Sequence, residues 1–237
     1  MCGRFTLTSV DRGWLAEAFG VRVEDLEEIS EVVIPRFNIA PTQQHWIVAA
    51  RGEERAPRRA SWGLVTDGAR AGDAARFINA RSEDVARRPT YREAFRLRRC
   101  VVPADGFLEW QPGAARAPRP YWFHRPDHGA LRLAGLFAEP VAAGGPERPA
   151  SFTILTTAAG DDVAPIHDRM PVLLADDTAV DSWLHAREPA DRLRSLLRPA
   201  SAGSLVSRAV SPRVNTPAND DPGCLAAVEA ASQPTLL

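Results

Sequence analysis

The chain begins MCGRF, and the cysteine in second place is its most unusual chemical group. Removal of Met1 would leave Cys2 with a free α-amine two carbons away from its thiol. Such an aminothiol is a rare reagent in proteins, because one residue presents two different nucleophiles. Cys2 is therefore the first candidate for covalent chemistry.

The basic side chains make this amine more unusual still. All 29 of them are arginine, and the sequence contains no lysine. Codon bias in a GC-rich genome accounts for the origin of this composition, but the chemical consequence holds regardless. Because arginine stays protonated and does not form imines, the N-terminus is the only primary amine of the chain.

Two motifs carry candidate acid–base groups. In ADGFLEWQ, the two-residue period of a strand places Phe107 and Glu109 on one face, where apolar neighbours would raise the pKa of the carboxyl group and suit it to proton transfer. A glutamate on an edge strand facing water is the alternative, and the motif alone favours it. His167, in PIHDRMP, follows a strand and a Gly-Asp-Asp loop, where catalytic residues often lie. A lone loop histidine is more often structural or solvated.

Two polar segments offer candidates for binding. In FINARSE, Asn79 and Arg81 lie where an apolar run changes to a helical pattern, with Ser82 as a candidate N-cap. Capping accounts for Ser82 but gives no structural reason for Asn79 and Arg81. In RFNIAPTQQ, Asn38 and Pro41 indicate a turn, for which a structural role is the default.

Length and composition limit the classes of protein to consider. With 237 residues, 45% of them hydrophobic, the chain can bury one core, and we expect a single domain over residues 1–237. Its apolar runs fall far short of the ~20 residues of a membrane helix, and its start lacks a secretory pattern. We therefore expect a cytoplasmic protein without a membrane partner. The three cysteines have the spacing of neither a disulfide framework nor a zinc site, so we expect no metal: Cys2, Cys100 and Cys224.

The distribution of charge leaves the partner open. The formal net charge of −1 does not by itself indicate a nucleic acid. Arginines nevertheless gather in RRPTYREAFRLRRC, residues 87–100, around two aromatic side chains. A solvated helix face and a phosphate-binding stripe explain this segment equally well.

These candidates need a framework of strands and short helices to position them. Helices are predicted over residues 9–20, 176–186 and 189–198, with Ser9 as the N-cap of the first and Gly20 as its stop. Strands without regular intervening helices favour an α+β fold over a doubly wound one. The predicted strands are residues 44–50, 61–65, 99–102, 106–110, 121–124, 131–137, 151–157 and 171–174.

The motifs together resemble a known family. MCGRF, RFNIAPTQ, WGLV, INARSE, CVVPADGFLEW, AGLF, TILTTAAGDDVAPIHDRMPVLL and VSRAVSPRVN occur in the order of the successive blocks of the SOS response-associated peptidase family. The resemblance spans nearly the whole chain. It implies a single α+β domain with a mixed, largely antiparallel, curved or barrel-like sheet flanked by short helices.

The resemblance also implies a function. The family senses and shields abasic sites in single-stranded DNA at replication forks, without a cofactor or an obligate protein partner, and links to them through its N-terminal cysteine. The protein would then be cytoplasmic and associated with the nucleoid when bound to DNA. The implied residues around the sugar are Cys2, Asn79, Glu109 and His167. The implied lining of the DNA path is Arg4, Asn38, Pro41, Arg81, Thr156 and Arg169.

One segment departs from the family pattern. Relatives usually carry a proline and one or two tryptophans after the WGLV block, whereas this chain continues TDGARAGDA. An aromatic side chain there would stack on bases. Which group stacks on the bases here is therefore an open question.

The chemistry follows from the groups themselves. An abasic deoxyribose opens to an aldehyde, and an α-amine with a reference pKa of ~7.7–8 is neutral often enough near pH 7 to attack it. The thiol of the same residue then closes a thiazolidine on the imine, an intramolecular step with a high effective molarity. We expect His167 to protonate the sugar ring oxygen, Glu109 to move protons on the amine and the C1′ oxygen, and Asn79 to orient the sugar. Arginine contacts to phosphates would make binding tolerant of sequence and dependent on salt.

Two other classes of function remain. One is a thiol or N-terminal-nucleophile peptidase, in which Cys2 attacks an acyl group and His167 is the base; self-removal of Met1 is its minimal form. The other is a noncatalytic single-strand-binding module. A covalent adduct on abasic but not intact DNA distinguishes both from the crosslinking function.

Overall fold

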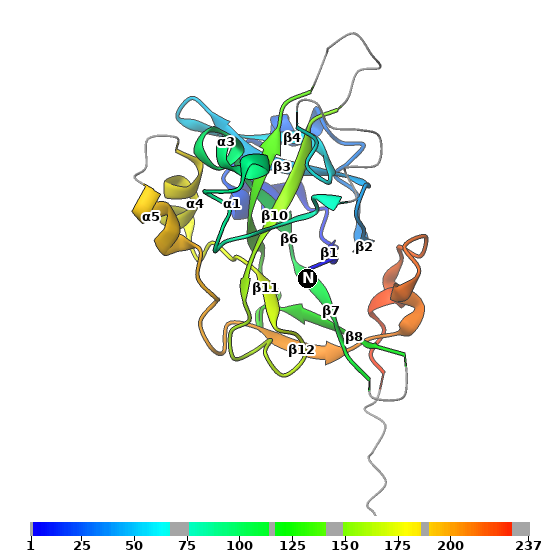
Figure 1. Ribbon diagram of the computed structural model, residues 1–237. Coiled ribbons are helices and arrows are strands. Elements are labelled where there is room, and N and C mark those ends of the chain that lie inside the picture. Colours follow the sequence, from blue (N-terminus) through cyan, green and yellow to red (C-terminus); the bar gives the residue numbers. More distant parts are fainter. Residues whose placement is uncertain (1, 67–75, 114–116, 141–148, 186–189, 229–237) are drawn as a thin grey trace, which may run out of the picture.

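The computed structural model describes residues 2–66, 76–113, 117–140, 149–185 and 190–228. Within these ranges the chain forms two β-sheets with short helices around them, which confirms the predicted α+β fold (Figure 1). The strands are β1 (Arg4–Leu7), β2 (Arg36–Ile39), β3 (Gln44–Arg51), β4 (Glu54–Trp62), β5 (Asn79–Arg81), β6 (Arg99–Ala104), β7 (Gly106–Gln111), β8 (Arg119–His124), β9 (Leu131–Ala138), β10 (Ser151–Ala158), β11 (Arg169–Pro171) and β12 (Val206–Ala209).

The larger sheet closes into a barrel. Its order is β11-β10-β4-β3-β6-β9, and an additional antiparallel pairing of β9 with β10 joins the ends of the path from β10 to β9. β10 runs parallel to β4 and β5, so the sheet is mixed, while its other ladders are antiparallel. The buried side chains of Trp46, Trp62 and Phe152 belong to its strands.

The smaller sheet carries the N-terminal strand. Its order is β12-β8-β7-β1-β2, with antiparallel neighbours throughout. The chain passes from the barrel to this sheet between β6 and β7, at Asp105, whose carboxylate accepts hydrogen bonds from the hydroxyls of Thr6 and Thr8 at 2.6 Å each. The next residue must be a glycine, Gly106, because a Cβ at this position would lie 2.1 Å from the indole nitrogen of Trp122. This crossing fixes β7 beside β1.

Short helices cover the sheets, and α4 and α5 lie together at one side (left in Figure 1). The N-cap predicted for the first helix was wrong: Asp11, not Ser9, accepts a hydrogen bond from the backbone of Trp14. Gly20 ends that helix in the left-handed region, at φ 65°, as predicted. The helices are α1 (Arg12–Phe19), α2 (Val23–Glu27), α3 (Pro89–Leu97), α4 (Asp177–Leu184), α5 (Ala190–Leu196), η2 (Pro212–Asn215) and η3 (Pro222–Leu225).

Some elements differ from the sequence prediction. The predicted turn around Asn38 begins as a strand, β2, and turns only after Ile39. The run 61–65 is the end of β4, which stops at Trp62. Most of TDGARAGDA lies outside the described residues. In the part of the chain that the structure describes, no helix has both the length and the apolar character needed to cross a membrane.

Candidate active site

The four predicted catalytic residues lie in two contacting pairs. Cys2 precedes β1, whose Arg4 is opposite Leu108 of β7, so the N-terminus lies beside the strand that carries Glu109 (Figure 1). The side-chain amide of Asn79 donates a hydrogen bond of 2.8 Å to the carbonyl oxygen of Cys2. The Nε2 atom of His167 lies 3.8 Å from the Glu109 carboxylate. The two pairs are coupled electrostatically, because the negative charge of Glu109 contributes to raising the pKa of the Cys2 thiol.

Glu109 is buried rather than turned to solvent, with 2% of its surface exposed. Burial raises its pKa to about 7, and the negative charge of Asp168 contributes to the rise. The alternative of a solvent-facing glutamate, which the motif alone favoured, does not hold. A carboxyl group with this pKa exchanges its proton readily at neutral pH.

His167 lies in the loop between β10 and β11, where Asp168 and the backbone of Arg169 surround its Nδ1 atom. The amide of Arg169 lies 2.9 Å from Nδ1, and two acceptors lie nearby: the carbonyl oxygen of Arg169 at 3.2 Å and the carboxylate of Asp168 at 3.1 Å. The other ring nitrogen, Nε2, faces Glu109. Burial lowers the pKa of His167, which keeps the ring neutral near pH 7. The ring thus places Nε2 on the side of Glu109.

Asn79 is the first residue of β5 and is held on two sides. It lies opposite Ile154 of β10, and its backbone carbonyl accepts a hydrogen bond of 3.1 Å from the hydroxyl of Tyr91 on α3. Its Nδ2 atom binds Cys2. Its Oδ1 atom is buried and has no hydrogen-bond partner within the described residues. One acceptor thus remains for a ligand beside the N-terminal residue.

The thiol of Cys2 is fully buried and makes only a weak contact of 3.8 Å with the carbonyl oxygen of Arg4. Burial raises its pKa well above the ordinary value, and the charge of Glu109 raises it further. The resting side chain is therefore a neutral thiol rather than a thiolate.

Arg4 and Asn38 form a structural junction with the C-terminal part of the chain. Arg4 donates to Asn38 Oδ1 at 2.7 Å and to the carbonyl oxygen of Val214 at 2.8 Å. Asn38 is fully buried, and its Nδ2 atom lies within 3.1 Å of the carbonyl oxygens of Val214, Thr216 and Asn219. These bonds engage the whole amide group.

Three other residues predicted to line the DNA path lie on adjacent strands. Arg81 is opposite Thr156, which in turn is opposite Pro171 of β11, the strand that Arg169 begins. Arg81 is exposed and makes no side-chain hydrogen bond or ion pair with the described residues. Thr156 is almost fully buried. Pro41 lies apart from this group, half-buried in the turn before β3.

Arg169 is engaged by a residue that the sequence did not single out. Its guanidinium group forms a bidentate pair with Glu83, at 2.5 and 3.0 Å, and donates to the carbonyl oxygen of Thr156 at 2.7 Å. This pairing holds the pKa of Glu83 below its ordinary value. A phosphate at Arg169 would have to share or displace this carboxylate. Glu83 follows Arg81 by two places in the FINARSE motif. Its acidic side chain was the only indication in the sequence of the contact with Arg169.

The donor set does not suit a metal ion. Among the residues that the structure describes, no cluster of three or more histidine, cysteine or acidic side chains could hold one.

A comparison of sequences decides the family. The profile described as SOS response associated peptidase (SRAP) matches residues 1–217. The chain belongs to this family. The abasic site processing protein YoqW of Bacillus subtilis is 32% identical over 225 residues, which are 94% of this chain and 97% of that one. The abasic site processing protein HMCES of Gallus gallus is 32% identical over 229 residues, covering 82% of this chain and 67% of that one.

Solved structures share the fold. A protein from Bacteroides thetaiotaomicron aligns with a TM-score of 0.81 at 20% identity, over 96% of this chain and 100% of that one. A protein from Bordetella bronchiseptica aligns with a TM-score of 0.69 at 26% identity, over 89% of this chain and 100% of that one. The SRAP family and its fold, both predicted from the motifs, are thus confirmed.

Proposed function

We propose that this protein recognises abasic sites in single-stranded DNA and links to them covalently through Cys2 after Met1 has been removed. The relatives named abasic site processing proteins support the substrate class. The observations that carry the proposal are two contacts between separate segments: the Asn79 side chain bonded to the Cys2 carbonyl oxygen, and His167 facing a buried Glu109. The covalent link, the strand preference and the removal of Met1 are the parts of the proposal that need testing.

The reaction balances without a cofactor. The α-amine of Cys2 adds to the C1′ aldehyde of the opened sugar, and loss of water leaves an imine. The thiol then adds across the C=N bond: its sulfur bonds to C1′ and its proton passes to the nitrogen. The product is a thiazolidine ring, whose closure is favoured because both nucleophiles belong to one residue.

The state of the thiol favours this order of events. Since burial and Glu109 keep the thiol protonated, the amine is the better first nucleophile at neutral pH. The same observation disfavours a thiol peptidase, which needs a thiolate or a base that generates one. We therefore rank the peptidase function below crosslinking.

Glu109 and His167 divide the proton transfers. The carboxyl group, with a pKa of about 7, can take a proton from the attacking amine and return it to the departing hydroxyl of the carbinolamine. In its protonated form, His167 can give a proton from Nε2 to the sugar ring oxygen as the ring opens, and the neutral ring that results takes a proton back from water or from the Glu109 carboxyl group. Asn79 holds the backbone of Cys2 with Nδ2 and offers Oδ1 to a sugar hydroxyl.

Among the described residues of the proposed DNA path, Arg81 has no side-chain partner, Arg4 is bonded to Asn38 and Val214, and Arg169 is paired with Glu83. Arg81 can take a phosphate directly, whereas Arg169 must rearrange its pair with Glu83. Such contacts give affinity without reading sequence. Binding should weaken with salt as counterions are displaced.

The test is incubation with an oligonucleotide that carries one abasic site, followed by denaturing electrophoresis. We expect a covalent band with the abasic strand and none with an intact strand of the same sequence. Binding without a covalent band would support the noncatalytic module. Cleavage of the protein's own N-terminus with no adduct on DNA would support the peptidase.

A further inference from the structure

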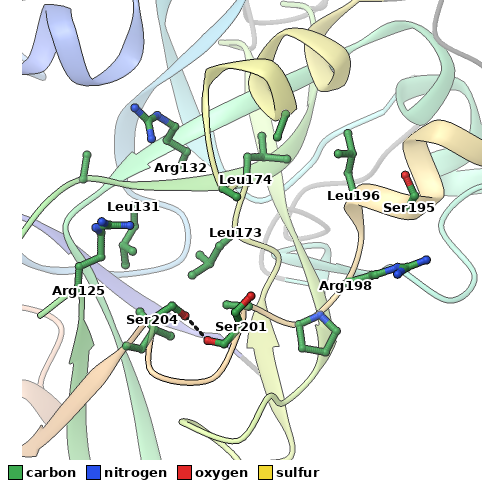
Figure 2. A pocket seen from close by; sticks show the side chains of 16 residues that line it. Arg125, Leu131, Arg132, Leu173, Leu174, Ser195, Leu196, Arg198, Ser201 and Ser204 are labelled. Carbon is green, nitrogen blue, oxygen red and sulfur yellow. Dashed lines mark hydrogen bonds between the residues drawn. The ribbon is translucent and has the colours of Figure 1, made fainter.

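A cavity that none of the candidate catalytic residues lines is drawn in Figure 2. Its volume is about 290 Å³, and its lining does not include Cys2, Asn79, Glu109 or His167. This volume is near the lower limit of the ~300–1,000 Å³ that ligand pockets occupy, which is room for a few apolar groups. Segments far apart in the sequence form its walls: Arg125, residues 130–132, 173–175, Ala179, 195–196, 198–201 and 204–205.

The lining combines an apolar floor with basic groups. Five of the residues that line the cavity are leucines. Among the described residues, the lining contains no aspartate or glutamate. Leu173 and Leu196 are only half-buried, so the floor exposes apolar surface to a ligand. In Figure 2, Leu173 lies between Arg125 on one side and Arg198 on the other. The leucines are Leu131, Leu173, Leu174, Leu196 and Leu205.

The arginines differ in how far they are engaged. Arg198 is exposed and makes no side-chain hydrogen bond or ion pair within the described ranges. Arg125 pairs with Asp127, whose side chain is 59% exposed, and such surface pairs are weak and exchangeable. Arg132 is held by the carbonyl oxygen of Ala18 at 2.9 Å. Within the described residues Arg198 is thus unpaired and can take an anionic group, whereas Arg125, on the opposite side of the apolar floor, must exchange its bidentate pair with Asp127 for one.

We propose that this cavity is a docking site for a short acidic peptide segment of a partner protein, with a large apolar side chain on the leucines and flanking carboxylates at Arg125 and Arg198. Charge complementarity and the apolar floor together select this occupant. A nucleic-acid backbone would pair with the arginines but leave the leucines uncovered, and a small inorganic anion would do the same.

The test uses the full chain and a fluorescein-labelled peptide, Asp-Asp-Asp-Gly-Leu-Phe, in fluorescence anisotropy. Two matched peptides replace either the three aspartates by asparagine or the Leu-Phe pair by Ser-Ser. We expect each replacement to weaken binding roughly tenfold or more, because each removes one of the two contributions. Equal binding of all three peptides, or no binding of the first at millimolar protein, would overturn the proposal.

Protein variants locate the binding. Arg198→Glu changes an exposed side chain and should weaken binding of the first peptide roughly tenfold. Arg92→Glu makes the same charge change on α3, outside the cavity, and should leave the affinity for this peptide unchanged. Thermal melting checks that both variants fold. Equal effects of the two variants would overturn the assignment to this cavity. Displacement of the peptide by an intact single-stranded oligonucleotide would assign the cavity to nucleic acid instead.

Discussion

The Glu109→Gln substitution keeps the size of a side chain that is 2% exposed and removes its titratable group. If Glu109 moves protons during imine formation, crosslinking should slow by about 10²–10⁴-fold, the usual contribution of a general acid–base group. Affinity for intact single-stranded DNA should change by less than about twofold, because Glu109 is given no phosphate contact. The pH–rate profile of the native protein should bend near pH 7, and the variant should lose that inflection while keeping the one that belongs to the amine.

The Glu109→Gln substitution should slow crosslinking but increase the relative stability of the folded protein at neutral pH. The pKa of Glu109 rises from 4.5 to about 7 on folding, so this group favours the folded state below pH 4.5 and loses that contribution as the pH rises through 7. The shift corresponds to at most on the order of 3 kcal/mol, since one pKa unit is about 1.4 kcal/mol. Glutamine carries no charge at any pH, so the variant should gain stability relative to the native protein as the pH rises from 4.5 to 8.

Two assays check the prediction together. Single-turnover crosslinking on denaturing gels gives the rate, and urea denaturation at pH 5 and pH 8 gives the difference in unfolding free energy. A rate unchanged within about threefold would refute the catalytic role of Glu109. A variant whose relative stability does not depend on pH would refute the raised pKa itself.

The remaining predictions concern the N-terminus and the DNA path. A variant with an N-terminal extension that retains Met1 should bind single-stranded DNA but form no stable crosslink, since an acylated nitrogen cannot form an imine; electrophoresis of the denatured mixture checks this. Cys2→Ala should leave an amine that borohydride can trap, yet its unreduced adduct should hydrolyse for want of a thiol. Arg81→Ala should weaken binding in anisotropy titrations and lower the slope of log K against log salt by about one, with the crosslinking rate at saturating DNA preserved.

Part of the fold and site could be predicted because the signals are local. Strand alternation and the turn before Gly106 placed β7 from a few residues, and the left-handed stop at Gly20 follows from the missing Cβ. The candidate catalytic residues lie in short motifs, but for Glu109 and His167 a solvent-facing or structural role was the favoured explanation, and the resemblance to the family singled them out. Asn79 is the exception, since helix capping did not account for it.

The rest could not be predicted because it depends on partners far along the chain. The Arg4 and Asn38 junction joins β1 and β2 to residues more than 170 positions away, and no local pattern indicates those bonds. The bonding of Arg169 to Glu83 crosses 86 positions. The burial of Glu109 also depends on distant parts of the chain. The two-residue period of the strand could not decide whether this side chain faces water or the protein interior, because the residues that cover it come from other elements.

The most direct test of the central claim is mass spectrometry of the unreduced crosslink between the processed protein and an abasic oligonucleotide. Because the chain has no lysine, the only primary amine is that of the N-terminal residue. We predict that the adduct maps to the peptide beginning with Cys2, with both its amine and its thiol resistant to labelling, and that the stable adduct is absent in Cys2→Ala. A stable adduct on Cys100 or Cys224, or one undiminished in Cys2→Ala, would contradict the account.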